Sequence, residues 1–238
     1  MFKQKIEIEK WKVNLINFPL FIISYKNERL KMNIPDKVVN RLTLYHFILD
    51  DLREDEKYIS STKISNLLNM DNSQVRKDLK YLDNSGKCRV GYEVKSLKRK
   101  IEECLGFKQT KDAFIVGAGN LGSALAKYNS FKDYGLNILA MFDKDPKKIG
   151  TIINGKEVFD ISKVGNLAIR LGVDIAILTV QREYAQGVAN YLAGAGIKYI
   201  WNFTPCVLDL PKDVKIWNEN LIGSFLQFTN NDKKEEIK

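Results

Sequence analysis

A glycine-rich loop near the middle of the chain limits the folds that the sequence can adopt. The apolar run Ala113–Val116 leads directly into Gly117-Ala-Gly-Asn-Leu-Gly122, and the segment Leu121–Tyr128 continues with the apolar character of a buried helix. The next apolar run, Ile138–Phe142, ends at Asp143, 21 residues beyond the last glycine of the loop. A strand, a GxGxxG loop, a helix and an acid after the next strand are the parts of a dinucleotide-binding βαβ unit. The sequence therefore predicts such a unit here.

Each glycine of the loop has its own expected role. Gly117 allows the tight turn after the strand, Gly119 lets the backbone approach a pyrophosphate, and Gly122 lets the helix pack closely against the strand. The N-terminus of that helix presents free N–H groups and the positive end of its dipole to the phosphates. We therefore expect the phosphate-binding residues to be Gly117, Ala118, Gly119, Asn120, Leu121 and Gly122.

The acid after the second strand indicates which nucleotide binds. Asp143 can accept hydrogen bonds from an adenosine ribose, and its charge would repel a 2′-phosphate. NAD(H) is thus favoured over NADP(H), although the nearby Lys144 and Lys147 weaken this preference. The alternative is a similar domain that holds another nucleotide, or CoA, at the same loop.

The region 108–217 around this unit alternates between strand and helix patterns. Val173–Val180 and Ile197–Trp201 are typical of buried parallel strands, and Tyr184–Ala193 is typical of the helix between them. The predicted fold class is α/β, with a Rossmann-like, doubly wound parallel sheet.

Residues 32–107 have a different organisation, typical of a winged helix. Pro35 suits the start of a helix, a short second helix follows, and Ser73 can cap a third helix that runs to about Asp83. The breaker Asn84-Ser85-Gly86 separates this third helix from Lys87–Val94, which alternates like a strand or a wing. The sequence therefore predicts a helix-turn-helix followed by a wing.

Positive charge is concentrated in the same part of the chain. The net charge is +9, and residues 76–100 carry nine basic against three acidic groups, a local excess of +6. Arg76, Lys77 and Lys80 fall on the side of the third helix opposite its apolar residues. This pattern favours a helix that lies in the DNA major groove while basic side chains neutralise phosphates. The alternative is a small helical domain with a solvated charged face.

The composition excludes several kinds of site and of location. The chain has one histidine, His46, so HExxH zinc sites are excluded, and with no CxxC pair among its three cysteines a thiolate zinc site is not expected. No segment is long and apolar enough to cross a membrane, and no cleavage pattern of a signal peptide follows the first residues. We expect a cytoplasmic protein, with residues 1–31 as an extension or as leader sequence ahead of a start at Met32.

The sequence offers no catalytic group for hydride transfer. A dehydrogenase needs a proton donor near the nicotinamide. His46 falls in the helical N-terminal part, and Tyr128 and Tyr184 are candidates by residue type only. A nucleotide site without a catalytic half suggests a sensor rather than an enzyme. A small NAD(P)-dependent oxidoreductase is the alternative.

Several short motifs in this order resemble the Rex family of redox-sensing transcriptional repressors. The most specific are Gln74-Val-Arg-Lys-Asp-Leu79, Gly117–Ala126 with Phe142-Asp143, and Asn202-Phe-Thr-Pro205. The resemblance covers roughly residues 33–229. It implies a homodimer that binds a palindromic DNA operator and releases it when NADH binds, with residues 218–238 forming an exchanged dimerisation helix and a polar tail.

The resemblance also implies roles for individual residues. The expected DNA-binding residues are Ser73, Gln74, Arg76, Lys77, Lys80, Lys87, Arg89 and Tyr92. The expected NAD(H)-binding residues, besides the glycine loop, are Asp143, Lys144, Thr179, Val180, Phe203, Thr204 and Pro205. The expected switch and dimer residues are Tyr128, Asn220, Leu221, Phe225 and Phe228. For the two phenylalanines a role in the helix core is weighed equally with a role at the partner's nicotinamide.

The chain departs from the family pattern in two places. Where many members have an Arg in the first helix and an Asp before the exchanged helix, this chain has Phe47 and Asn220, so both ends of an ion pair are missing. The wing order Cys88-Arg89-Val90-Gly91-Tyr92 shifts an Arg by one position, which in a strand points it to the other face. The alternative prediction is therefore a Rex-like regulator whose NADH switch is lost or altered.

Overall fold

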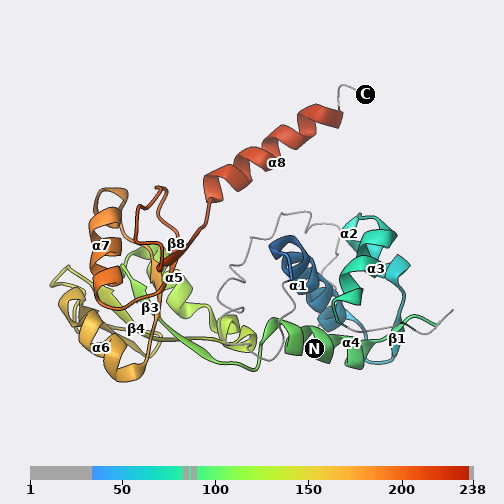
Figure 1. Cartoon of the computed structure of the whole chain (residues 1–238), viewed down its shortest axis with the longest axis horizontal. Helices are drawn as coiled ribbons and strands as arrows, with labels where there is room; N and C mark the ends of the chain where they lie inside the picture. Colours follow the sequence, from blue (N-terminus) through green and yellow to red (C-terminus); the bar gives the residue numbers. More distant parts are fainter. Residues whose placement is uncertain (1–33, 83–85, 87–89, 236–238) are drawn as a thin grey trace, which may run out of the picture.

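The computed structural model describes residues 34–82, 86 and 90–235, with side chains described as far as Asn230. The predicted extension 1–31 and the predicted wing residues Lys87 and Arg89 lie outside this part. The described residues form a helical N-terminal domain, an α/β domain and a C-terminal helix (Figure 1).

The N-terminal domain is built around a small apolar core. Its elements are α1 (Asp36–Asp51), β1 (Tyr58–Ile59), α2 (Ser61–Leu68), α3 (Asn72–Lys80), β2 (Tyr92–Glu93) and α4 (Val94–Leu105). The two short strands pair antiparallel. The helices are amphipathic, and they bury Leu42, Tyr45, Ile64, Leu79, Leu97 and Ile101 almost completely. The predicted helix-turn-helix is confirmed, with α2 and α3 as its two helices.

Three details of this domain differ from the sequence predictions. The cap of α3 is Asp71 rather than Ser73, because the Asp71 carboxylate accepts a hydrogen bond from the Ser73 N–H at 2.5 Å. The helix α3 ends at Lys80, before the predicted end near Asp83. The strand predicted to run to Val94 ends at Glu93, and Val94 starts α4 instead.

The α/β domain contains a seven-stranded sheet in the described residues. Its strands are β3 (Lys111–Val116), β4 (Leu136–Asp143), β5 (Ile152–Ile153), β6 (Lys156–Asp160), β7 (Ile175–Leu178), β8 (Tyr199–Asn202) and β9 (Lys215–Asn218). The order across the sheet is β5-β6-β4-β3-β7-β8-β9, and every pairing is parallel except that of β5 with β6. The predicted doubly wound parallel sheet is confirmed.

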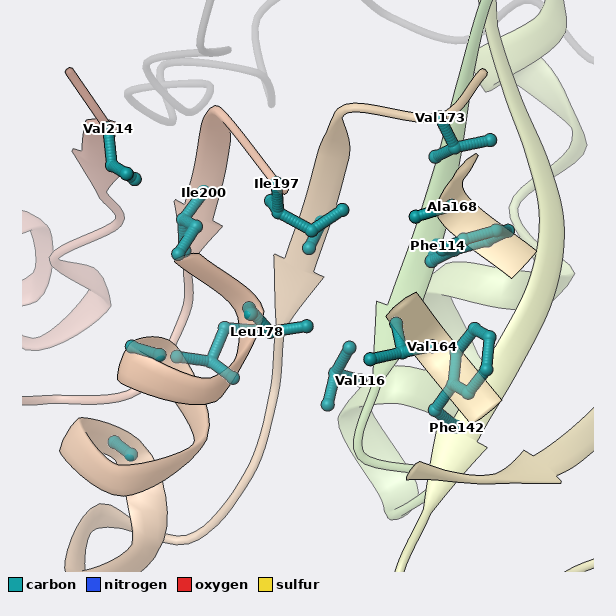
Figure 2. Packing of buried hydrophobic residues seen from close by; sticks show 14 of the residues in the cluster. Phe114, Val116, Phe142, Val164, Ala168, Val173, Leu178, Ile197, Ile200 and Val214 are labelled. Carbon is teal, nitrogen blue, oxygen red and sulfur yellow. The ribbon is translucent and has the colours of Figure 1, made fainter. Parts of the chain in front are cut away.

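Alternate residues of the central strands build a core on each face of the sheet. Phe114 and Val116 pack with α6 (Val164–Leu171) and α7 (Arg182–Gly194), and Figure 2 shows them beside Phe142 of β4. The rings of Phe114 and Phe142 meet edge to face, with centroids 4.9 Å apart. The opposite face of β3 packs with α5 (Asn120–Lys127) and with the 3-10 helix η3 (Asn129–Tyr134). This period-two division follows from strand geometry.

The last helix, α8 (Leu221–Glu235), extends away from both domains (Figure 1). Its first turn is capped by Asn220, whose side-chain oxygen accepts a hydrogen bond from the Gly223 N–H at 2.8 Å. The large apolar side chains of this helix are half or more exposed: Leu221, Ile222, Phe225, Leu226 and Phe228. Within the described residues, no helix combines the length and the hydropathy that crossing a membrane requires.

Candidate dinucleotide site and DNA-binding helix

Most predicted cofactor residues meet at one edge of the large sheet. The strands β4, β3, β7 and β8 are neighbours in this order, and their carboxyl ends are paired in register from Phe142 through Val116 and Leu178 to Asn202. The chain leaves β3 toward β4 on one side and later returns to β7 on the other. Such a reversal point is where open α/β sheets bind their ligands.

The glycine loop has the geometry that each of its glycines was expected to supply. Gly117 has a φ of +106°, and a Cβ there would lie 2.8 Å from the backbone of Thr179. A Cβ on Gly122 would collide with the Gly117 carbonyl oxygen, whereas a Cβ on Gly119 would meet no atom within 4 Å. The backbone at Gly119 is therefore open to a ligand. The helix α5 starts directly after it, without a side-chain cap that would occupy its free N–H groups.

Thr179 braces the glycine loop from the neighbouring strand. Its N–H donates to the carbonyl of Val116 at 2.9 Å, and its hydroxyl donates to the carbonyl of Gly117 at 2.8 Å. The residue was predicted to line the nicotinamide end of the site. Its hydroxyl holds the turn after β3, and its place at the nicotinamide end stays a prediction.

Asp143 holds the other side of the loop. One carboxylate oxygen accepts from the Ala118 N–H at 2.8 Å and from the Lys148 ammonium at 3.0 Å, and the other accepts from the Asp145 N–H at 3.0 Å. Burial raises the pKa of Asp143, but these three donors together hold its pKa below the ordinary value. Asp143 is therefore ionised at neutral pH.

Two lysines near Asp143 have different partners. Lys148 forms the ion pair with Asp143, and the sequence analysis missed this role although the residue lies only five positions further on. The predicted ligand residue Lys144 places its ammonium 3.3 Å from the ring centroid of Tyr184. This cation–π contact joins the end of β4 to the start of α7.

The segment after β8 is organised by a buried amide. The Asn202 side chain is fully buried, accepts from the Thr204 N–H at 2.9 Å, and donates to the carbonyl of Cys206 at 3.1 Å. The Thr204 hydroxyl donates to the Val180 carbonyl at 2.9 Å, which joins this segment to the end of β7. Phe203 and Pro205 flank Thr204 at the same edge of the sheet, so the predicted nicotinamide segment is adjacent to the glycine loop. Asn202 itself was not predicted as a site residue.

The predicted switch residues do not join this site within one chain. Tyr128 follows α5, is 52% exposed, and packs edge to face on Phe131 with centroids 4.9 Å apart. Asn220 and Leu221 begin α8, and Phe225 and Phe228 point into solvent rather than into the core of their own chain. His46 is buried in the N-terminal domain, where its ring nitrogens lie 3.2 Å from carboxylate oxygens of Asp50 and Glu102.

The predicted DNA-reading helix α3 is fixed to α1 through one buried carboxylate. Asp78 accepts from the Arg41 guanidinium at 2.5 and 2.7 Å, from the Tyr45 hydroxyl at 2.7 Å and from the Gln74 amide at 2.8 Å. Burial raises the pKa of Asp78, but the hydrogen bonds from these groups outweigh it and leave the pKa below the ordinary value.

This arrangement divides the predicted DNA-binding residues into two groups. Ser73, Arg76, Lys77 and Lys80 are exposed on α3 and free to face a duplex. The Gln74 amide is turned toward Asp78, and Tyr92 packs on the domain core. Gln74 and Asp78 lie one turn apart on the same helix, so the sequence allows this contact, but it does not show whether the amide faces Asp78 or a duplex.

Comparison with known proteins gives the same division of the chain. A family model described as "Putative DNA-binding protein N-terminus" matches residues 33–80, and one described as a CoA binding domain matches residues 108–206. The redox-sensing transcriptional repressor Rex of Bacteroides fragilis is 38% identical over 205 residues, covering 86% of this chain and 93% of the relative. The Rex protein of Clostridium botulinum is 39% identical over 200 residues, covering 84% and 95%.

Solved structures extend the likeness to the fold. RSP, a Rex-family repressor, in complex with NAD⁺ and operator DNA aligns with a TM-score of 0.78 at 37% identity, covering 87% of this chain and 96% of that chain. RSP in complex with NADH aligns with a TM-score of 0.77 at 37% identity, covering 87% and 98%. On its sequence, its fold and the geometry of its glycine loop, the chain belongs to the Rex family of redox-sensing transcriptional repressors.

Proposed function

We propose that this chain is a repressor that binds a palindromic DNA operator as a homodimer and releases it when NADH binds. The observation that carries the proposal is an open glycine loop and an exposed basic helix in one chain. In the relative RSP, the same two-domain fold has been solved with operator DNA and NAD⁺, and with NADH. A DNA-binding protein of this family acts in the cytoplasm.

The dinucleotide binds with its pyrophosphate at Gly119 and the N-terminus of α5. Asp143 then receives the adenosine ribose: three of its roughly four acceptor positions are taken by Ala118, Asp145 and Lys148, which leaves one for a ribose hydroxyl. Phe203, Thr204 and Pro205 line the nicotinamide end, together with Val180.

The DNA is bound by α3 and the adjoining wing. Arg76, Lys77 and Lys80 contribute positive charge on the exposed side of α3, and Ser73 lies at its N-terminal end, where base edges are reached in this class of motif. The Gln74 amide donates to Asp78 and so helps to orient α3, and its predicted contact with DNA stays a prediction.

The homodimer forms through α8. An amphipathic helix with five large apolar side chains half or more exposed gains stability when it docks against a second copy. In a dimer that exchanges α8, the helix of one protomer packs against the other protomer. Nucleotide binding in one subunit therefore affects the conformation of both.

The test is DNA binding by fluorescence anisotropy with the purified full chain. The duplex carries the region upstream of the protein's own gene, the salt concentration is fixed because affinity depends steeply on it, and NADH is titrated against excess NAD⁺. Release of the duplex as the NADH fraction rises is the expected result. Tight binding that ignores NADH contradicts the redox part of the proposal.

A second candidate is a DNA-binding regulator of the same family without an NADH switch. It is favoured by the use of Phe47 and Asn220 inside their own chain: the Phe47 ring packs on Tyr134 with centroids 5.9 Å apart, and Asn220 caps α8. Under this candidate the double variant Phe47→Arg, Asn220→Asp gains NADH sensitivity. An unchanged response of the double variant counts against it.

A further inference from the structure

A buried carboxylate lies at the base of the C-terminal helix. Glu219 sits between β9 and α8 and is 8% exposed. One of its carboxylate oxygens accepts from the Trp201 indole N–H at 2.9 Å and from the Trp217 indole N–H at 3.2 Å. Its own backbone N–H donates to the Asn202 carbonyl at 2.8 Å. Glu219 therefore joins the ends of β8 and β9 to the first residues of α8.

An acid at this position is costly for the fold. Burial raises the pKa of Glu219, and the two indole donors offset this only in part. A buried carboxylate held by two neutral donors often contributes no more stability than an apolar residue of similar size. The carboxylate fixes the orientation of the two indole rings, because both rings must point their N–H groups at it.

The Trp201 indole also contacts the candidate nucleotide site. The Trp201 ring packs against Phe203 with centroids 4.7 Å apart, and against Phe131 with centroids 5.9 Å apart. Phe203 begins the segment at the nicotinamide end, and Asn202 between these two residues donates to the Asn218 side chain at 2.8 Å. A shift of this segment must therefore move Trp201, and Glu219 with it.

We propose that Glu219 is the positioning residue that couples the dinucleotide site to α8, acting through the indole N–H groups of Trp201 and Trp217. This role rests on the proposed function, since it assigns the path by which nucleotide binding reaches the dimer helix. Glu219 touches neither nucleotide nor DNA in this assignment. It sets the direction in which α8 leaves the sheet.

The test compares three full-length variants with the wild type. Glu219→Leu replaces the carboxylate by an apolar group of similar size and so removes the oxygen that accepts from both indoles. Trp217→Phe keeps an aromatic ring and removes one of the two donors. Asp213→Asn is the matched control, because this exposed carboxylate near the same strand pairs with Lys198 and contacts neither indole.

Two ratios are measured for each protein. The first is the operator dissociation constant in saturating NADH divided by that in saturating NAD⁺, from anisotropy at fixed salt. The second is the same ratio for the dimer dissociation constant, from sedimentation. The dissociation constant of NADH itself, from its fluorescence, separates coupling from nucleotide binding.

Loss of coupling with intact binding is the expected result. An allosteric ratio of about fivefold or more in the wild type falls to within about twofold of unity in Glu219→Leu and by a smaller factor in Trp217→Phe. The control keeps the wild-type ratio, and the NADH dissociation constant and the operator affinity in NAD⁺ stay within about threefold of wild type. A merely structural role would lower all affinities together.

The other outcomes decide against the coupling role, the proposed function or both. Wild-type ratios in Glu219→Leu overturn the coupling role. If the operator affinity of the wild type ignores NADH, the proposed function fails. The dimer ratio then decides for Glu219: its persistence in Glu219→Leu overturns the role and its loss supports it. If the wild-type dimer also ignores the nucleotide, there is no coupling and both statements are overturned.

Discussion

At the scale of the residue, the Asp78 carboxylate fixes the orientation of the DNA-binding helix. Its side chain is 1% exposed and receives four hydrogen bonds from Arg41, Tyr45 and Gln74. Removing one partner of a buried, hydrogen-bonded ion pair leaves the other buried and uncompensated. The stability of the N-terminal domain and the orientation of α3 therefore depend on the same side chain.

Asp78→Asn is expected to lower the free energy of unfolding by about 3 kcal/mol, because it leaves the Arg41 guanidinium without its counter-charge. Urea unfolding followed by circular dichroism measures this. Asp71→Asn on the same helix is the matched control, since Asn is as good a cap as Asp and the change should cost only a few tenths of a kcal/mol. Equal losses in both variants would contradict the central role of Asp78.

The same carboxylate gives the protein an acid-sensitive component of stability. The pKa of Asp78 lies below the ordinary value of 3.8, so the unfolded chain binds a proton more readily than the folded one. The contribution of Asp78 is present above about pH 3.8 and is lost as the pH falls through its lowered pKa. A plot of unfolding free energy against pH should therefore be flatter at its acid end for Asp78→Asn than for the wild type.

At the scale of the element, the turn between β3 and α5 contains one glycine that the fold requires and another that leaves room for a ligand. A Cβ at Gly122 collides with the Gly117 carbonyl, whereas a Cβ at Gly119 meets open space. Gly122→Ala is expected to lower the melting temperature of the ligand-free protein by several degrees. Gly119→Ala is expected to leave it unchanged and to weaken NADH binding about tenfold or more, because the methyl group occupies the place of the pyrophosphate. Calorimetry and NADH fluorescence distinguish the two, and a reversed order would refute this division.

The helix α8 allows an equally direct test of its apolar face. Phe225 is 62% exposed in the single chain, and Phe225→Asp places a charge at this position. The change is expected to weaken the dimer at least tenfold, since burying a Phe contributes about 1.5–3 kcal/mol. Gln227→Asp, on the polar side of the same helix, controls for the added charge. Sedimentation velocity over a range of concentrations measures both, and a monomeric wild type would disprove the dimer.

The elements differ in how well the sequence predicts them, and the reason is burial. The central strands β3, β4, β7 and β8 are covered on both faces, so they are continuous apolar runs with a clear signal. The edge strands β5 and β9, and the helix α6, have short or mixed patterns and were not predicted. In the site, the glycine loop and Asp143 were found because their spacing is fixed by chemistry. Lys148, Asn202 and the inward Gln74 act through contacts with nearby residues, and the sequence shows these residues but not the direction in which their side chains point.

At the scale of the whole molecule, an aromatic residue of the α/β domain packs against the N-terminal domain. Tyr134, at the end of η3, inserts among N-terminal side chains, with ring centroids 4.9 Å from Phe107, 5.9 Å from Phe47 and 6.1 Å from His46. Burial, with the charge of Asp50 and other neighbours, raises the pKa of Tyr134 to about 12. These ring contacts join the α/β domain to the N-terminal domain.

Tyr134→Ala is expected to weaken operator binding at least fivefold while the NADH dissociation constant stays within about twofold of wild type. When the angle between the domains is less fixed, the spacing of the two recognition helices no longer matches the two halves of the palindrome. The glycine loop is unchanged. Anisotropy and NADH fluorescence measure the two constants. Tyr191→Ala, an exposed ring on α7 away from the junction, is the control. Equal losses of both affinities would show that the variant acts on folding rather than on domain angle.

The open glycine loop has a consequence for what the protein reports to the cell. NAD⁺ and NADH are chemically identical at the pyrophosphate and the adenosine ribose, so under the proposed function the loop and Asp143 hold both forms equally. Their contribution cancels whenever the two forms compete for a filled site, and only the nicotinamide end contributes to the difference. Under the proposed function, the loop keeps the site occupied when the total amount of NAD⁺ and NADH changes. DNA binding then depends on the ratio of NADH to NAD⁺ and not on the amount of cofactor.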